Sequence, residues 1–327
     1  MSYPISDHSD GRVFFNPGDG PRAVRRRLRF LLRWQFGQRE RGAWPEHVPL
    51  PGFPPPAATG VPTNGAAVTF LGHASFLIRL PGLTLLTDPA FSERCSPLSW
   101  AGPKRVAPPG VAPADLPRPD IVLLSHNHYD HLDVPSLRAI AARHRPAFVA
   151  PLGNRSFLAR HGIAAAECDW WQSLSFGPVR ITATPARHFA ARFLHDRNRT
   201  LWAGFMVETP QGRILFAGDS GAGPHWTAIG ERLGTPDLAL LPIGAYEPRW
   251  MMQSVHMNPE EAVAAHRSLG ARRSLGMHFG TFRLTDEAYD APVQGLIAAR
   301  DAAGMAAEDF DVLGLGETRA FAFTTPG

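Results

Sequence analysis

The chain has 327 residues, with 33 Lys and Arg against 29 Asp and Glu and a formal net charge of +4. A hydrophobic content of 44% with 19% charged residues is typical of a globular protein of one large or two ordinary domains. No apolar run approaches the roughly 20 residues that span a bilayer, and no secretory signal pattern begins the chain, so we expect a cytoplasmic protein. Two cysteines, Cys95 and Cys168, without a CxxC motif exclude a disulfide framework and a structural zinc knuckle.

Positive charge is concentrated near the N-terminus, where residues 21–41 carry eight arginines and one glutamate, +7, which leaves −3 for the rest. The pattern over Pro21–Phe36 predicts a basic amphipathic helix that could lie on an anionic membrane surface or pack its apolar side on its own domain. Nucleic acid binding is not expected, because aromatic residues for base stacking are few. Closely spaced prolines make Pro45–Pro62 an extended strap. We therefore predict residues 1–62 as a helix and strap packing on the core, and 63–327 as the main domain.

From Val68 onward, short apolar runs alternate with helical patterns. This order predicts a layered α/β (α+β) architecture, and the number of strands requires two sheets or a barrel. The clearest helix is Pro259–Leu269, with Asn258 as N-cap, proline at its first position and Gly270 after its end; Val134–His144 is another. Strands are predicted over Val68–Leu80, Leu83–Thr87, Ile121–Ser125, Ala147–Pro151, Val179–Thr184, Trp202–Val207, Ile214–Ala217, Leu238–Pro242 and Ser274–His278.

Four metal-capable side chains lie within residues 126–131, His-Asn-His-Tyr-Asp-His, directly after an apolar run. Imidazole and carboxylate suit a divalent metal such as zinc, with iron or manganese as alternatives. Three more such residues follow predicted strands: His188, Asp219 and His278. Each alone is more often a hydrogen-bonded turn residue than a ligand. Their recurrence at strand ends predicts one metal centre.

The seven positions resemble those of the metallo-β-lactamase superfamily, whose HxHxDH motif matches residues 126–131. More narrowly, residues 70–75 (FLGHAS), 216–221 (FAGDSG), 242–250 (PIGAYEPRW) and 256–262 (HMNPEEA) look like the N-acylphosphatidylethanolamine-hydrolysing phospholipase D branch. The likeness runs from about Phe15 to Arg319. The first motif specifies only the superfamily, whereas IGAYEPRW and HMNPEEA are specific to this branch and its bacterial relatives.

The resemblance implies a four-layer αββα sandwich with a dinuclear zinc site at one edge. Carried over, the first metal would be held by His126, His128 and His188, the second by Asp130, His131 and His278, and Asp219 would bridge. Two divalent ions can share a hydroxide that is nucleophilic at neutral pH and can polarise a phosphoryl oxygen. Asp130 is also a catalytic candidate, because its second oxygen could orient that hydroxide.

His256 precedes the helix at Pro259, so its imidazole could stabilise phosphate charge or protonate a leaving group; a hydrogen-bonded loop histidine is the alternative. His73 is expected behind the ligands, and His225 and His266 are expected to be structural. Met251 and Met252 suit acyl chains or the core. The residues predicted to contact substrate are Tyr246, Arg249, Trp250, Met251 and His256.

We therefore predict a zinc-dependent phosphodiesterase of phospholipase D type that acts on (N-acyl)phospholipids, in the cytoplasm or peripheral on the inner face of the membrane. A lactonase or cyclic-phosphate hydrolase acting on a small soluble substrate is the rival, since the same centre attacks carbonyls and phosphoryls. A membrane-binding protein with a vestigial site is disfavoured, because no ligand position is missing. Residues 221–226 and Val255 depart from branch members, which leaves headgroup and acyl preference open. The oligomeric state is also open, a homodimer being one option.

Overall fold

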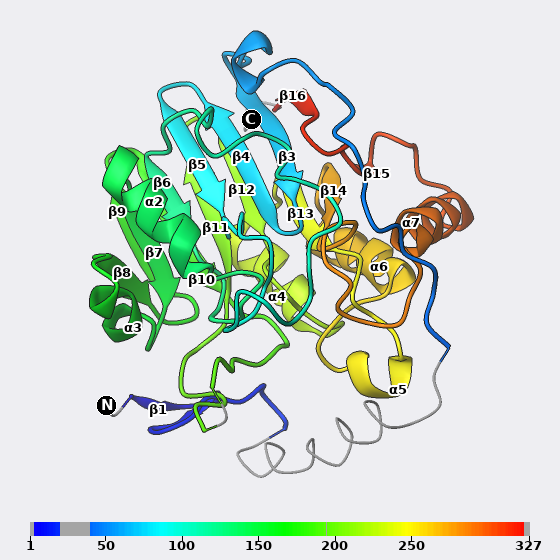
Figure 1. Ribbon diagram of the computed structural model, residues 1–327. Helices are drawn as coiled ribbons and strands as arrows, with labels where there is room; N and C mark the ends of the chain where they lie inside the picture. Colours follow the sequence, from blue (N-terminus) through cyan, green and yellow to red (C-terminus); the bar gives the residue numbers. More distant parts are fainter. Residues whose placement is uncertain (1–2, 20–39, 194, 324–327) are drawn as a thin grey trace.

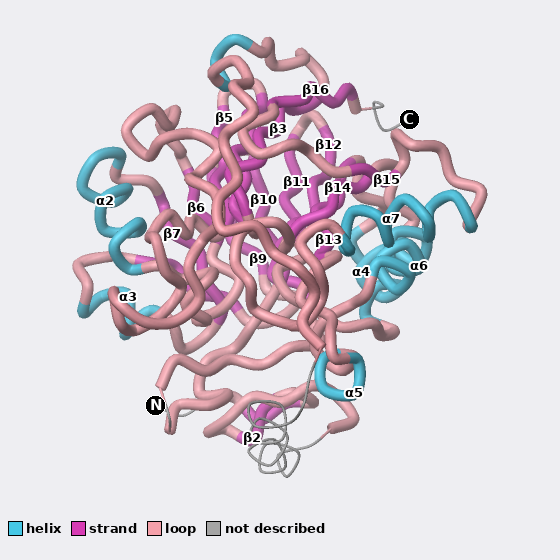
Figure 2. The backbone as a smooth tube through the Cα atoms, turned by 45° about the vertical axis from the view of Figure 1, so that its right-hand side comes forward, coloured by secondary structure: helices cyan, strands magenta, loops and turns pink. Residues whose placement is uncertain are grey.

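The computed structural model describes residues 3–19, 40–193 and 195–323. Two seven-stranded sheets pack face to face, and helices cover their outer faces (Figure 1). In the view of Figure 2, α2 and α3 lie on one side of the sheets, and α4, α6 and α7 on the other. The predicted αββα sandwich is confirmed. The predicted basic helix over residues 21–36 lies outside the described residues.

The first sheet has the order β16-β3-β4-β5-β6-β7-β8 and is antiparallel from β16 to β5 and parallel from β5 to β8. Parallel strands bring their carboxyl ends to one edge, where the loops after them meet. Its strands are β3 (Gly65–Gly72), β4 (Ser75–Leu80), β5 (Leu83–Thr87), β6 (Ile121–Leu123), β7 (Ala147–Pro151), β8 (Ala165–Cys168) and β16 (Thr318–Ala322).

The second sheet has the order β15-β14-β13-β12-β11-β10-β9, antiparallel from β9 to β12 and parallel from β12 to β15. A separate short hairpin pairs β1 (Ile5–Ser6) with β2 (Ser9–Asp10) near the N-terminus. The strands of the second sheet are β9 (Ser173–Phe176), β10 (Val179–Thr184), β11 (Gly204–Thr209), β12 (Gly212–Phe216), β13 (Leu238–Pro242), β14 (Ser274–Met277) and β15 (Phe310–Asp311).

Helices α2 (Val134–His144) and α6 (Pro259–Leu269) have the bounds that the sequence predicts. In α6 the Asn258 side chain accepts from Glu261 N at 2.9 Å and the Glu261 carboxylate accepts from Asn258 N at 3.1 Å, a reciprocal cap, while Gly270 ends the helix with a φ of 64°. None of the described helices is long and apolar enough to cross a membrane. The helices are α2 (Val134–His144), α3 (Arg155–Arg160), α4 (His225–Leu233), α5 (Arg249–Met252), α6 (Pro259–Leu269), α7 (Ala291–Ala302) and a 3-10 turn (Pro56–Ala58).

One predicted strand, Val68–Leu80, is two strands joined by a tight turn at His73, which has a φ of 58°. Both strands are buried almost throughout, and their apolar residues favoured one long strand over the turn signal at residues 72–75, Gly-His-Ala-Ser. The turn places the His73 ring at the edge of the sheet where the loops meet.

The main core fills the space between the two sheets. Large side chains such as Trp202, Phe76, Phe205 and Phe216 are fully buried there, and each stabilises the fold by about 1.5–3 kcal/mol or more. A second cluster, including Leu86 and Leu137, packs α2 on the outer face of the first sheet. This double layer of packing gives the site loops rigid supports.

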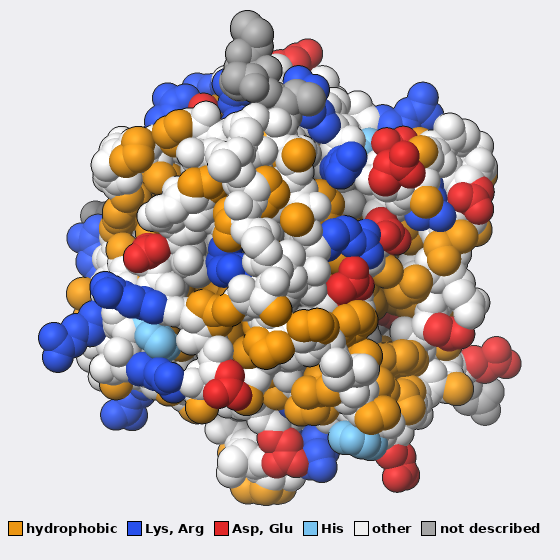
Figure 3. Space-filling view, turned by 90° about the horizontal axis from the view of Figure 1, so that it is seen from above, with side chains coloured by type: hydrophobic (Ala, Val, Ile, Leu, Met, Phe, Trp, Pro, Cys, Tyr) orange, Lys and Arg blue, Asp and Glu red, His pale blue; other side chains and the backbone are white. Residues whose placement is uncertain are grey.

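The described part of residues 1–62 contacts the main domain. Phe14 N donates to Asn198 O at 2.8 Å, His8 Nε2 lies 2.8 Å from an Asp169 oxygen, and Gly42 N donates to Asp286 O at 2.7 Å. The boundary at residue 62 stays a prediction. On the face shown in Figure 3, basic, acidic and apolar side chains are interspersed.

Candidate metal centre

All seven predicted ligand residues converge at one edge of the sandwich. Residues 126–131 follow β6 in the first sheet, whereas the other three follow strands of the second sheet. His188 comes after β10, Asp219 after β12 and His278 after β14. Loops from both sheets therefore build one cluster, most of it buried.

Three imidazoles form the first group of donors. His126 Nε2 lies 2.8 Å from His128 Nδ1, and His188 Nε2 lies 3.2 Å from the same atom. Donors about 2.0–2.1 Å from a tetrahedral ion lie about 3.3 Å from one another. The spacing fits ligands of a single ion, because one donor atom from each of the three residues lies within 4.8 Å of the other two.

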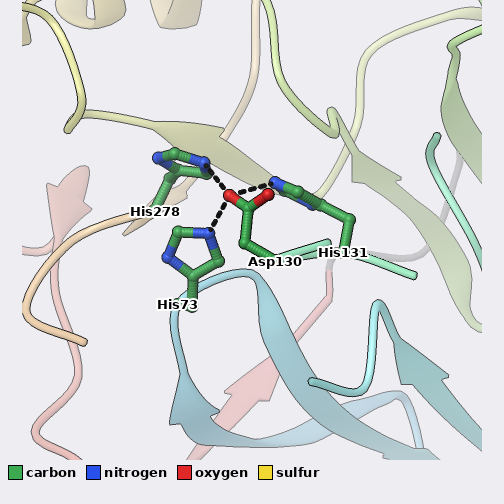
Figure 4. A group of neighbouring side chains, drawn as sticks. All are labelled: His73, Asp130, His131 and His278. Atoms are coloured by element: carbon green, nitrogen blue, oxygen red, sulfur yellow. Dashed lines mark hydrogen bonds and ion pairs between the residues drawn. The ribbon is translucent and has the colours of Figure 1, made fainter. Parts of the chain in front are cut away.

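The second group contains Asp130, His131 and His278. Asp130 Oδ2 lies 3.3 Å from His131 Nε2 and 3.5 Å from His278 Nε2 (Figure 4). His73 Nε2 lies 2.9 Å from that oxygen as well. Because a carboxylate only accepts, His73 donates to Asp130 and fixes its orientation. The predicted place of His73 behind the ligands agrees with this contact.

Asp219 lies between the two groups. Its Oδ2 is 3.1 Å from His278 Nε2 and 3.2 Å from His131 Nε2 on one side, and 3.7 Å from His188 Nε2 on the other. Its Oδ1 is buried without a hydrogen-bond partner among the described residues. A buried, unsatisfied carboxylate oxygen is costly, and a cation is a partner that would satisfy it. The donor set therefore fits two divalent ions that share Asp219.

The imidazoles fall into two kinds, with lowered and with raised pKa. Burial, together with neighbouring imidazoles, holds the pKa of His126 well below 6.5, and burial lowers the pKa of His128 to about 4. These rings are neutral and offer lone pairs. Burial also opposes protonation of His278, but Asp219 and Asp130 override it and raise its pKa to about 9; the same carboxylates raise the pKa of His131. Cations at the second group would displace those protons.

Asp88 supports the ligands, and the sequence prediction did not include it. Its carboxylate accepts from His131 Nδ1 at 2.6 Å and from Ser125 N at 2.7 Å, and the Ser125 hydroxyl donates to it too. The proton on Nδ1 leaves Nε2 of His131 with its lone pair toward the cluster. Asp88 directly follows the predicted strand Leu83–Thr87, so the strand-end signal used for the other residues was present here as well.

Three residues of this region have positive φ without being glycine: His73 at 58°, Asp88 at 30° and His278 at 65°. Such conformations cost of order 1–3 kcal/mol each and persist where the surroundings impose them. His73 and Asp88 are hydrogen-bonded within the cluster, and His278 Nε2 lies 3.1 Å from Asp219 Oδ2, so the strained backbone occurs where side chains are placed for the site.

His256 lies beside the centre. Its ring centroid is 5.0 Å from that of His188 and 5.2 Å from that of His278, and it groups with His188 and Asp219 at metal-binding distances. Burial lowers its pKa to about 3. The ring is neutral at physiological pH, so it can donate a hydrogen bond more readily than it can deliver a proton.

The other predicted substrate residues lie in the adjoining segment 246–252. Arg249 Nη2 donates to both oxygens of the Glu261 carboxylate, at 2.7 and 2.8 Å, and Nη1 donates to His256 O at 3.1 Å. It thereby ties the His256 loop to α6. Tyr246 and Met251 are half-buried, and Trp250 is exposed.

Two further histidines have structural hydrogen bonds, as expected. His225 Nε2 lies 2.9 Å from the Ser220 hydroxyl, and His266 Nδ1 lies 2.8 Å from the Ser274 hydroxyl. Ser220 neighbours Asp219, so its bond to His225 steadies the loop of the bridging carboxylate. The two cysteines are free and buried.

The chain belongs to the β-lactamase superfamily, whose domain profile matches residues 84–279. Together with the His/Asp cluster, this defines a metal-dependent hydrolase of the metallo-β-lactamase superfamily. N-acyl-phosphatidylethanolamine-hydrolyzing phospholipase D 1 of Caenorhabditis elegans is 40% identical over 73% of this chain and 71% of its own length. An uncharacterised Mycobacterium tuberculosis protein is 40% identical over 83% of the chain and 73% of its own length. The structure of Igni18, a metallo hydrolase of Ignicoccus hospitalis, shares the fold with a TM-score of 0.61 at 23% identity over 79% of this chain and 99% of its own.

Proposed function

We propose that this hydrolase binds two divalent ions, preferably zinc, and cleaves the phosphodiester of an (N-acyl)phospholipid on the headgroup side of phosphorus. The observation that carries the proposal is the pair of donor groups joined by Asp219. The lipid substrate rests on the 40% identity to a phospholipase D that acts on N-acylphosphatidylethanolamine.

His126, His128 and His188 would hold one ion, Asp130, His131 and His278 the other, and Asp219 both. When bound, such ions lower the pKa of coordinated water and polarise a phosphoryl oxygen. Asp130 contributes through its two oxygens. His73 holds Oδ2, and Oδ1, which has no hydrogen bond among the described residues, can accept the proton of the attacking water and orient its lone pair toward phosphorus.

His256 has the complementary role. Its Nδ1 is buried and has no partner among the described residues. A neutral ring there can donate to a non-bridging phosphoryl oxygen, and the bond strengthens as charge develops on that oxygen. Arg249 holds this loop in place through its bond to His256 O. Tyr246, Trp250 and Met251 would contact the lipid beside it, and the basic segment 21–36 would attract an anionic membrane surface.

Metal analysis and a lipid assay test the proposal. Purified protein should contain two divalent ions per chain, and vesicles of N-acylphosphatidylethanolamine should yield phosphatidate and the N-acylethanolamine. Fewer than two ions would refute the dinuclear centre. Rapid turnover of a lactone or cyclic phosphate without any phosphatidate from lipids would refute the substrate class and favour the rival hydrolase.

A further inference from the structure

A separate cavity of about 630 Å³ lies beside the metal centre. Its walls come from the N-terminal segment at Tyr3 and Arg12, from α3 with the turn before it, and from residues 192–193 and 196–200. In Figure 1 the N-terminal hairpin and α3 lie at the same lower corner of the molecule. The volume is that of a small-molecule site.

The N-terminal segment packs closely against the other walls of the cavity. Tyr3 Oη donates to Arg199 O at 3.0 Å, and a Cβ on Gly153, which has a φ of 91°, would lie 2.5 Å from Tyr3 Oη. Glycine is therefore needed for this approach on both conformational and steric grounds. The cavity is thus a built feature of the described chain and includes its N-terminal segment.

Positive charge dominates the lining. Four arginines, at positions 12, 160, 192 and 199, face one carboxylate, Asp196, among the described lining residues. Asp196 Oδ1 already accepts hydrogen bonds from the backbone N–H groups of residues 192 and 193. Arg192 donates to two carbonyl oxygens and stacks on the Tyr129 ring at 3.9 Å. The guanidinium groups of Arg12, Arg160 and Arg199 have no ion pair within the described chain, so they can bind an anion.

The same cavity has unsatisfied polar groups. Asn127 and Asn154 line it, are 4% and 1% exposed, and each has a side-chain oxygen without a hydrogen-bond partner among the residues the structure describes. The hydroxyl oxygen of Thr200, also in the lining, is buried and unpartnered as well. These oxygens have almost no accessible surface, so they lie within the wall and a ligand in the cavity does not reach them.

Asn127 connects the cavity to the metal centre. It lies between His126 and His128, and its backbone oxygen accepts from Arg192 at 3.0 Å. A ligand that contacts the Asn127 side chain therefore touches the segment that carries two of the donors. Occupation of the cavity can thus alter the placement of those imidazoles.

We propose that this cavity binds a phosphate group, held by the arginines of its lining. The ligand could be a soluble polyol phosphate or the headgroup of an anionic lipid such as phosphatidylglycerol. Both present the same chemistry to the site.

Direct binding tests the proposal independently of lipid hydrolysis. Calorimetry with the metal-loaded protein would compare glycerol 3-phosphate, inorganic phosphate and glycerol. Flotation would compare phosphatidylcholine vesicles that contain phosphatidylglycerol with vesicles of phosphatidylcholine alone. The test variant is Arg160→Ala combined with Arg199→Ala, both exposed positions, and Arg118→Ala is the matched control.

We expect glycerol 3-phosphate, phosphatidylglycerol vesicles or both to bind, and the double variant to weaken that binding by about tenfold or more while Arg118→Ala leaves it unchanged. Soluble binding identifies a free ligand, and vesicle binding alone identifies a headgroup. Equal binding by the parent and the double variant would overturn the proposal, because phosphate would then be bound elsewhere, as at the metals. A lack of binding in both arms would overturn it too.

Discussion

Replacing Asp88 with asparagine tests whether metal binding depends on a residue that would touch no metal. The change keeps size and shape but puts an NH₂ group where one carboxylate oxygen accepts a hydrogen bond. An asparagine oxygen can still accept from Ser125 N, at 2.7 Å in the parent. His131 Nδ1, at 2.6 Å, then faces a donor.

The magnitude follows from that single lost acceptor. Loss of a carboxylate behind a metal-binding histidine lowers affinity about 10–100-fold, or about 1.4–2.7 kcal/mol. A buried donor left without an acceptor also destabilises the fold by about 1–3 kcal/mol. Both effects act at His131, so the ion of the second group should be lost first.

Competition of the protein with a chromophoric chelator measures the two affinities separately, and thermal unfolding measures stability. The matched control is Asp237→Asn, because Asp237 is a buried carboxylate that accepts from Arg213 N at 2.9 Å, away from the centre. This control should lose stability but keep both affinities. If Asp88→Asn binds two ions with affinities within twofold of the parent, the reasoning is wrong.

Three more predictions follow from the centre. Because carboxylates raise the pKa of His278 to about 9 and that of His131 above 6.5, metal binding near pH 7 should release protons and weaken as pH falls; calorimetry in buffers of different ionisation enthalpy measures this, and zero release would contradict it. His256→Gln retains a donor, so it should keep more kcat than His256→Ala, with both variants binding two ions; equal rates would argue against a donor role. Arg249→Lys leaves one nitrogen where two guanidinium nitrogens hold Glu261 and His256 O, so it should lower kcat by roughly tenfold, whereas Arg180→Lys, at an exposed bidentate pair elsewhere, should not.

Ligand positions could be predicted from the sequence because each one follows a hydrophobic strand. The positions of His188, Asp219 and His278 after β10, β12 and β14 needed only the recognition of buried strands and their ends. Helix ends were predictable for a similar reason. Caps such as Asn258 and Gly270 act locally, through bonds to residues three or four positions away.

Contacts between segments distant in the chain were harder to predict from the sequence. Arg249 was predicted to contact substrate, and its ion pair with Glu261 depends on how the loop folds back on α6. Asp88 had the strand-end signal but no histidine or repeated motif beside it. The predicted strand ran through the turn at His73, although residues 72–75, Gly-His-Ala-Ser, interrupt the apolar run with turn-forming residues.

The centre also connects the two sheets, which leads to a prediction about stability. The first sheet supplies His126 and His128 to one proposed ion, and the second sheet supplies His188 to it; the second ion likewise joins Asp130 and His131 to His278. Each ion would therefore join loops that separate on unfolding. At a free metal concentration 1,000 times Kd, binding stabilises the folded state by about 4.1 kcal/mol, which corresponds to a rise in Tm on the order of 10 °C.

Calorimetry of the metal-free and metal-loaded protein measures that rise. Asp219→Asn is the informative variant, because its Oδ2 lies within 3.1–3.9 Å of donors in both groups. An amide there is a poor bridge, so metal should raise the Tm of this variant by much less than that of the parent. An unchanged Tm in the parent on loading would mean that the ions do not join the sheets, even if they bind. An equal rise in the variant would mean that Asp219 is not shared between them.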